Sequence, residues 1–231
     1  MQRRSLRCRP ASVRRWSAST STRCPRQSGC RTGATDVKVG ALALQGDFRE
    51  HLAVISRLGH DGVEVRTADE LAGVDALIIP GGESTTIGRL ATIYGLMDPI
   101  RDRIAGGMPV FGTCAGMIFL ASGTTGADQP QLGVLDVIVE RNAFGRQVES
   151  FEADLRITGL STPMRAVFIR APWIEKVGAD VEVLATVEDP DGGGEHAVVV
   201  RQDRILAVSF HPELTTDDRL HTMLIDLAEE R

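Results

Sequence analysis

The sequence has no long hydrophobic run and few aromatic residues. Of its 231 residues, 42% are hydrophobic and only 4% are aromatic. No stretch approaches the roughly eighteen consecutive apolar residues of a membrane span, and the N-terminus lacks the apolar segment of a secretory signal. We therefore expect no membrane association. The hydrophobic content is nevertheless sufficient for one medium-sized domain with a core.

Cysteine is scarce from Asp36 onward, where Cys114 is the only one. The other three, Cys8, Cys24 and Cys30, all lie before Asp36. A disulfide framework needs paired cysteines within the folded part of a chain. The sequence therefore predicts a cytoplasmic protein of a reducing compartment, with a single thiol that requires an explanation.

Acidic residues are absent before Asp36, although the same segment holds nine arginines. Removing these nine from the 26 basic residues leaves 17 against 31 acids, so the rest of the chain has a net charge of about −14 while the whole chain has −5. A segment rich in Arg, Ser, Thr and Pro buries too little surface to offset its ordering entropy. We expect residues 1–36 to be a disordered or non-native extension and residues 37–231 to be the domain.

Several interpretations of residues 1–36 stay open. The segment could be an organellar transit peptide, a nucleic-acid-binding arm or a cysteine-based metal site. The metal site is the weakest of these, because the cysteines form no CxxC pair. It could also be translation from a start assigned too far upstream. Two lysines against 24 arginines suggest GC-rich coding, in which a valine codon such as that of Val37 can serve as a start.

Strand-like and helix-like segments alternate from Lys38 onward. In the first half, strands are expected at 38–44, 62–66, 74–80 and 108–112, and helices at 48–58, 84–94, 99–106 and 117–121. Asp47 and Ser84 are expected as helix N-caps, and Gly59 as a helix-terminating glycine.

The second half of the chain is richer in strands. Strands are expected at 132–141, 147–157, 166–171, 181–187, 196–201 and 204–210, with a turn at 189–194 and a closing helix at 218–230. Alternating strands and helices with short glycine-rich links are typical of a parallel sheet covered on both faces. The predicted fold is one α/β domain with a mostly parallel central sheet.

A candidate nucleophile follows the fourth expected strand. Open α/β sheets bind ligands at the carboxyl ends of their strands, and GTCAG (112–116) has the Gly-x-nucleophile-x-Gly spacing of a nucleophile elbow. Cys114 would lie at a helix N-terminus, which favours the thiolate, and the Ala115 amide could donate to an oxyanion. The alternative is an inert buried cysteine, and the flanking glycines favour the nucleophile.

A candidate base follows the last expected strand. His211 and Glu213 lie two residues apart, so in extended geometry they point to the same side. An imidazole that takes the thiol proton, oriented by a carboxylate, completes a Cys-His-Glu triad. Zinc is not expected, because the spacing matches no metal motif and no fourth ligand is evident. The remaining histidines lack such a setting and are expected on the surface or in helices: His51, His60, His196 and His221.

The string PGGEST follows the third expected strand. Alone it is typical of a tight turn with a helix cap. Beside a nucleophile elbow, Gly81 and Gly82 become candidates to bring a backbone amide close to a tetrahedral intermediate and complete an oxyanion hole with Ala115. No Gly-Lys-Ser/Thr follows, so this is not a phosphate-binding P-loop.

These motifs resemble those of the class I glutamine amidotransferases. Five strings resemble more narrowly the glutaminase subunits of pyridoxal 5′-phosphate synthase: LALQGDFREH, PGGESTT, ERNAFGRQVESFEADL, FIRAP and SFHPEL. The resemblance runs from about Val39 to Leu227 and has no counterpart for the first 36 residues. RNAFGRQ and FIRAP are more specific than the triad. The resemblance implies a flavodoxin-like α/β fold.

The resemblance also implies the reaction and its residues. L-Glutamine would be hydrolysed to L-glutamate and ammonia through a thioester of Cys114, with His211 as general acid and base and Glu213 as its orienter. The implied glutamine contacts are Gly82, Glu83, Ser84, Arg141, Ile169 and Arg170. A cation such as Arg141 suits the substrate carboxylate and Glu83 suits its ammonium, although a structural ion pair is the alternative for Arg141 and Arg170.

The implied partner is a synthase subunit of (β/α)8-barrel fold, which receives the ammonia for vitamin B6 coenzyme synthesis within a large hetero-oligomer. No cofactor, metal or nucleic acid is implied. Two other classes of function stay open. One is a cysteine hydrolase of the peptidase or stress-response type on a similar fold. The other is a non-catalytic regulatory subunit, which the presence of all three triad residues disfavours.

Overall fold

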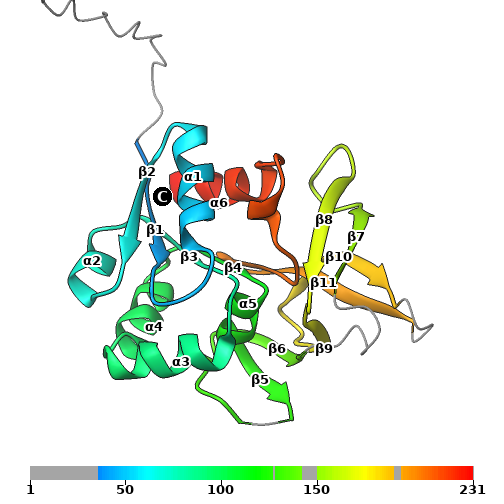
Figure 1. Ribbon diagram of the computed structural model, residues 1–231, viewed down its shortest axis with the longest axis horizontal. Helices are drawn as coiled ribbons and strands as arrows, with labels where there is room; N and C mark the ends of the chain where they lie inside the picture. Colours follow the sequence, from blue (N-terminus) through cyan, green and yellow to red (C-terminus); the bar gives the residue numbers. More distant parts are fainter. Residues whose placement is uncertain (1–35, 127, 142–149, 190–193, 231) are drawn as a thin grey trace, which may run out of the picture. The chain divides into compact units, whose positions relative to one another are not determined.

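The computed structural model describes residues 36–126, 128–141, 150–189 and 194–230, all within one compact unit, Thr35–Arg231 (Figure 1). The arginine-rich segment, most of the RNAFGRQ string and the middle of the expected turn at 189–194 lie outside the described residues. The extension at 1–36 and the domain boundary therefore stay predictions. None of the helices in the described ranges is long and apolar enough to cross a membrane.

A ten-stranded sheet forms the centre of the described part, in the order β2-β1-β3-β4-β12-β11-β9-β6-β5, with β10 paired to β11. Strands β2, β1, β3, β4 and β12 are parallel, and the sheet continues through antiparallel β11, β9 and β6. Strands β7 and β8 form a separate antiparallel pair. The strands are β1 Lys38–Leu42, β2 Asp61–Val65, β3 Ala76–Ile79, β4 Val110–Thr113, β5 Ala121–Thr125, β6 Leu135–Glu140, β7 Ser150–Leu155, β8 Met164–Ile169, β9 Trp173–Val177, β10 Glu182–Glu188, β11 Glu195–Gln202 and β12 Ile205–Val208.

Helices cover both faces of the parallel strands. The helices are α1 Phe48–Leu58, α2 Ala68–Ala72, α3 Ser84–Ile93, α4 Met97–Ala105, α5 Ala115–Leu120 and α6 Arg219–Glu229, with a 3-10 turn η1 at Pro212–Leu214. Figure 1 shows α1 and α6 on one side of β1, β3 and β4, and α3 and α4 on the other.

Strand β3 shows why the sheet is buried on both faces. Its Leu77 and Ile79 join the apolar cluster that contains Ile87 of α3. Its Ala76 and Ile78 join the other cluster, which contains α1 and α6 side chains. Alternate side chains of a strand point to opposite faces, so an uninterrupted apolar run supplies both clusters. The predicted α/β fold, with a mostly parallel sheet between two helical layers, is confirmed.

Three short elements were not expected from the sequence: α2, β5 and β9. Helix α2 is only five residues long, and a capping box between Thr67 and Glu70 sets its start. Strand β5 follows α5 directly at Ala121, which the sequence places in the helix. Helix α4 begins at Met97, earlier than the expected start at Pro99. Short elements offer too few residues for a periodic pattern to define them.

One of the two predicted N-caps is wrong. Asp47 is the N-cap residue of α1, as predicted, although its side chain makes no capping hydrogen bond. Helix α3 is capped by Glu83, whose carboxylate accepts from the Thr85 and Thr86 amides, and Ser84 is its first helical residue. The glycine prediction is confirmed, because Gly59 ends α1 in a left-handed conformation with φ 89°.

Candidate active site

The turn between β4 and α5 has the geometry of a nucleophile elbow. Cys114 has φ 48° and ψ −104°, which is strained for a residue other than glycine. Its amide donates to the Val208 carbonyl at 2.8 Å, which ties the turn to β12. A Cβ on Gly116 would lie 2.0 Å from the Ile79 carbonyl oxygen, so only glycine fits there. The local sequence therefore holds the thiol at the carboxyl end of the parallel strands.

His211 and Glu213 lie together beyond β12, as the sequence predicts. His211 Nδ1 lies 2.7 Å from Glu213 Oε1, and the Glu213 side chain is fully buried. The His211 amide donates to the Val167 carbonyl of β8 at 2.9 Å, which fixes the backbone at this point. Cys114 and His211 line the same pocket, and interaction with Cys114 raises the pKa of His211. The structure thus brings the three predicted triad residues together, with a hydrogen bond between His211 and Glu213.

The environment of His211 favours its protonated form. Burial alone lowers the pKa of His211, but its interactions with Cys114 and Glu213 outweigh burial and raise this pKa to about 10. An imidazole with a raised pKa readily accepts a proton from a neighbouring thiol. The arrangement is therefore suited to forming a thiolate and imidazolium pair.

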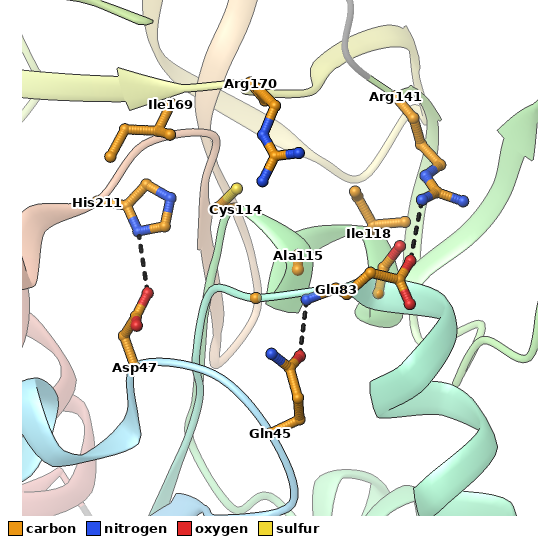
Figure 2. Close-up of a pocket in the computed structure, with 12 residues that line it drawn as sticks. Gln45, Asp47, Glu83, Cys114, Ala115, Ile118, Arg141, Ile169, Arg170 and His211 are labelled. Atoms are coloured by element: carbon orange, nitrogen blue, oxygen red, sulfur yellow. Dashed lines mark hydrogen bonds and ion pairs between the residues drawn. The ribbon is translucent and has the colours of Figure 1, made fainter. Parts of the chain in front are cut away.

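A pocket of about 360 Å³ opens over Cys114 (Figure 2). Its lining contains all six residues expected to contact glutamine, together with Cys114, Ala115 and His211. Cys114 and Arg170 are two of the three described non-glycine residues with positive φ, the second having φ 44°. Strained backbone of this kind gathers at functional sites. Glu213 and Gly81 are not among the described lining residues, and both lie behind the His211 ring rather than in the open space.

Arg141 and Glu83 form one charged wall of this pocket. Arg141 Nη2 lies 3.1 Å from Glu83 Oε1, and Arg141 Nη1 donates to Gln129 Oε1 at 3.1 Å. Partial burial acts to raise the pKa of Glu83, but hydrogen bonds from the Thr86 hydroxyl and from the amides of Thr86 and Thr85 outweigh it and lower this pKa to about 2. Glu83 is therefore a carboxylate at neutral pH.

The predicted oxyanion donors lie near the thiol. Ala115 is the first residue of α5, where backbone N–H groups have no partner within the helix. Gly82 has φ 145°, and a Cβ there would lie 2.5 Å from Gln45 Oε1. A Cβ on Gly81 would lie 2.5 Å from His211 Cε1. Glycine at position 81 thus lets the chain approach the His211 ring, and glycine at position 82 lets it approach Gln45.

Three residues that line the pocket were missed: Gln45, Asp47 and Ile118. Gln45 accepts from the Glu83 amide at 2.7 Å, and Asp47 Oδ2 lies 3.9 Å from His211 Nδ1 (Figure 2). Both follow β1, at the same edge of the sheet as Cys114. The rule that identifies the other loops, inspection of the residues after each parallel strand, would have found them.

Two histidines expected on the surface or in helices are instead buried inside the fold. His51 in α1 and His221 in α6 both have no exposed surface, and His51 Nδ1 lies 2.9 Å from His221 Nε2. Each is a helix residue, as the sequence suggests, but neither is on the surface. No local pattern shows that they contact each other or that His51 lies close to Glu213.

One group of potential metal ligands occurs among the described residues. Ligand atoms of Asp47, His211 and Glu213 lie within 4.8 Å of one another. His211 Nδ1 already makes the short hydrogen bond with Glu213, so the group serves to orient the imidazole. The absence of a metal requirement stays a prediction.

The comparisons with known proteins agree on one family. Residues 41–230 match the profile of the SNO glutamine amidotransferase family. A protein of Acidothermus cellulolyticus named pyridoxal 5′-phosphate synthase subunit PdxT is 60% identical over 194 residues, which cover 81% of this chain and 92% of that protein. The protein of the same name from a Parafrankia species is 55% identical over 193 residues, covering 82% and 92%.

A solved structure supports the same relationship. The crystal structure of a glutamine amidotransferase that is 55% identical superposes with a TM-score of 0.77 and covers 83% of this chain and 98% of its own. The family expected from the sequence motifs is confirmed, and these relatives favour neither the peptidase-type hydrolase nor the regulatory subunit. By its sequence match and its fold, the chain belongs to the SNO glutamine amidotransferase family.

Proposed function

We propose that this chain hydrolyses L-glutamine to L-glutamate and ammonia at Cys114, and that the ammonia serves synthesis of pyridoxal 5′-phosphate. The observation that carries the proposal is a single pocket that holds an elbow cysteine, an imidazole with a raised pKa and a pair of opposite charges. Membership of a glutamine amidotransferase family supports the same chemistry.

In the first step, His211 takes the Cys114 proton and the thiolate attacks the side-chain amide carbon of glutamine. The Ala115 amide at the start of α5 donates to the oxyanion that forms, together with an amide of the Gly81 and Gly82 loop. Glu213 holds the resulting imidazolium through Nδ1.

In the second step, the tetrahedral intermediate collapses. The C–N bond breaks, and His211 returns its proton to the departing nitrogen, so ammonia leaves and a γ-glutamyl thioester remains on Cys114. His211 then takes a proton from water, whose oxygen attacks the thioester carbon. Breakage of the C–S bond releases glutamate and restores the thiol with that proton.

The two charges in the pocket suit the zwitterionic end of glutamine. We assign Arg141 to the α-carboxylate and Glu83 to the α-ammonium. The remaining contacts come from Gly82 and Ser84 on one wall, and from Ile169 and Arg170 on the other. Because Arg141 is also bonded to Glu83 and Gln129, its guanidinium is held in place before substrate arrives.

The partner in this proposal is a synthase subunit of (β/α)8-barrel fold in a large hetero-oligomer. Support comes from the relatives, which are named as subunits of pyridoxal 5′-phosphate synthase. A cytoplasmic location belongs to the same proposal.

The test is replacement of the nucleophile. Cys114→Ala should abolish glutamate release, measured with and without a cognate synthase subunit, while binding of that subunit persists. Arg165→Gln, which removes two exposed ion pairs on the β7–β8 hairpin, is the matched control and should retain full activity. Glutamine turnover by the Cys114→Ala protein would refute the assignment of the nucleophile. Turnover of peptides or glyoxals by the wild-type chain, without glutamine hydrolysis, would refute the proposed substrate.

A further inference from the structure

A buried hydrogen-bond network lies behind the triad, on the side away from the pocket. His51, Thr113 and His221 are fully buried. His51 Nδ1 lies 2.9 Å from His221 Nε2, and His51 Nε2 lies 3.2 Å from Thr113 Oγ1. These residues come from α1, the end of β4 and α6. Three elements far apart in the sequence thus converge at the end of β4, next to Cys114 in the chain.

The second oxygen of Glu213 faces this network. Glu213 Oε1 is bonded to His211, whereas Oε2 is buried and accepts no hydrogen bond from any described residue. His51 Nε2 lies 3.5 Å from Oε2. Buried carboxylate oxygens are costly to leave unpaired.

Burial keeps both histidines neutral. It lowers the pKa of His51 well below its usual value, and His221 and His211 nearby lower this pKa further. Burial also lowers the pKa of His221, to about 4. Each imidazole therefore carries one proton at neutral pH, and its position decides which groups can pair.

The contacts select one of two proton arrangements. If His221 donates from Nε2 to His51 Nδ1, then His51 carries its proton on Nε2, where it faces the Glu213 carboxylate and Thr113. In the opposite arrangement, His51 donates from Nδ1 to His221 Nε2, and His221 carries its proton on Nδ1. The lone pair of His51 Nε2 would then face the carboxylate, and the N–H at His221 Nδ1 would be buried without a described partner. An unpaired buried N–H is rarer and costlier than an unpaired acceptor. The first arrangement is therefore favoured.

We propose that His51 is a positioning residue of the glutaminase reaction, which directs Glu213 toward His211 through an Nε2–H contact, with His221 fixing its tautomer. The proposal rests on the triad assigned above. The proposal adds two residues, His51 and His221, to the triad of Cys114, His211 and Glu213. His51 touches no substrate, since it lies outside the described pocket lining.

The test compares variants that remove or retain the donor. His51→Leu removes it, whereas His51→Gln places an amide N–H close to the position of Nε2. We expect His51→Leu to lower kcat about tenfold or more, as loss of a supporting hydrogen bond does at metal sites. The KM for glutamine should not change, because the charged wall of the pocket is untouched. His51→Gln should restore most of kcat.

A second measurement reports on the Cys114 thiol and does not require glutamine turnover. Alkylation of Cys114 by iodoacetamide, measured against pH, reports formation of the thiolate. If His51 holds Glu213 against the imidazolium, His51→Leu should shift the midpoint of this profile to higher pH, and His51→Gln should not. His221→Leu frees the His51 tautomer and should produce the same changes to a smaller extent, and His221→Gln should largely reverse them.

Phe111→Leu is the matched structural control. The Phe111 ring contacts both imidazoles, with centroids 6.4 Å from His51 and 5.5 Å from His221, and forms none of their hydrogen bonds. It should lower Tm and leave kcat and the alkylation midpoint unchanged. Wild-type kcat and midpoint in His51→Leu would overturn the proposal, as would equal losses in His51→Leu and Phe111→Leu.

Two further outcomes are also decisive. If His51→Leu does not fold, the comparison of His221→Leu with His221→Gln decides by the same criteria. An inactive Cys114→Ala protein beside a fully active His51→Leu protein would refute this inference alone, and an active Cys114→Ala protein would refute the triad itself.

Discussion

The buried imidazole of His221 couples the stability of the fold to pH. Burial lowers the pKa of His221 from 6.5 to about 4, while Asp218 raises it and Arg57 lowers it to smaller extents. Below pH 6.5 the unfolded chain binds a proton at this position that the native state does not bind. Stability therefore falls as pH decreases from about 6.5 to 4, and it is recovered as pH rises.

The size of this effect follows from the two pKa values. For a histidine whose pKa is 6.5 in the unfolded chain and about 4 in the folded protein, the free energy of unfolding falls by about 2 kcal/mol from pH 7 to pH 5. His221→Gln keeps an N–H donor for His51 and removes the titrating group. From pH 7 to pH 5, the free energy of unfolding of His221→Gln should therefore fall by about 2 kcal/mol less than that of the wild type.

The assay is urea denaturation of both proteins at pH 7 and pH 5. With a typical slope of about 2 kcal/mol per molar urea, the wild-type midpoint should fall by about 1 M more than that of His221→Gln. The raised pKa of His211 gives stability that is present below pH 6.5 and lost as pH rises toward 10. This contribution is the same in both proteins, so it cancels when their midpoints are compared. Equal shifts of the two midpoints would show that His221 titrates normally and is not buried as described.

Two further predictions concern the elbow and the pocket. Gly116→Ala should cost about 3 kcal/mol in the free energy of unfolding, because its Cβ would lie 2.0 Å from the Ile79 carbonyl oxygen. Gly73→Ala, whose Cβ would meet ordinary contacts at 3.5 Å, is the control, and equal losses in urea denaturation would contradict the elbow packing. Arg141→Gln should raise the KM for glutamine roughly tenfold with little change in kcat, because it removes one charge-assisted hydrogen bond to substrate. An unchanged KM in steady-state kinetics would instead leave Arg141 as a structural partner of the pocket wall.

The geometry of the proposed triad could be predicted because each of its parts is local. GTCAG defines the elbow within five residues, and His211 and Glu213 are two residues apart, so each motif has its geometry before the fold is known. Parallel strand order then brings both motifs to one edge of the sheet. The same rule, applied to the end of β3, also predicts the loop with Gly82 and Glu83, whereas Arg141, Ile169 and Arg170 were implied only by the family resemblance.

The caps were less predictable because a single local pattern allowed two outcomes. Both Glu83 and Ser84 can cap a helix, and the structure uses Glu83, whose longer side chain reaches two amides and Arg141 together. Asp47 occupies the N-cap position of α1, yet its carboxylate lies near His211 and does not bond the helix amides. In each case a tertiary contact with a second element decided the role of a residue that local chemistry left open.

The histidine network marks the limit of local inference, although one part of its signal was present. His51 falls between Phe48 and Ile55 at three- and four-residue spacing, on the apolar face of α1, so helical periodicity indicates that it is buried. Burial of an imidazole requires a partner for each polar nitrogen. No pattern within α1 identifies that partner, because His221 is 170 residues away and meets His51 only when α1 and α6 pack on the same face of the sheet. A polar residue at an apolar position of a predicted helix therefore indicates a buried network, and only the tertiary structure shows that this network ends at Glu213.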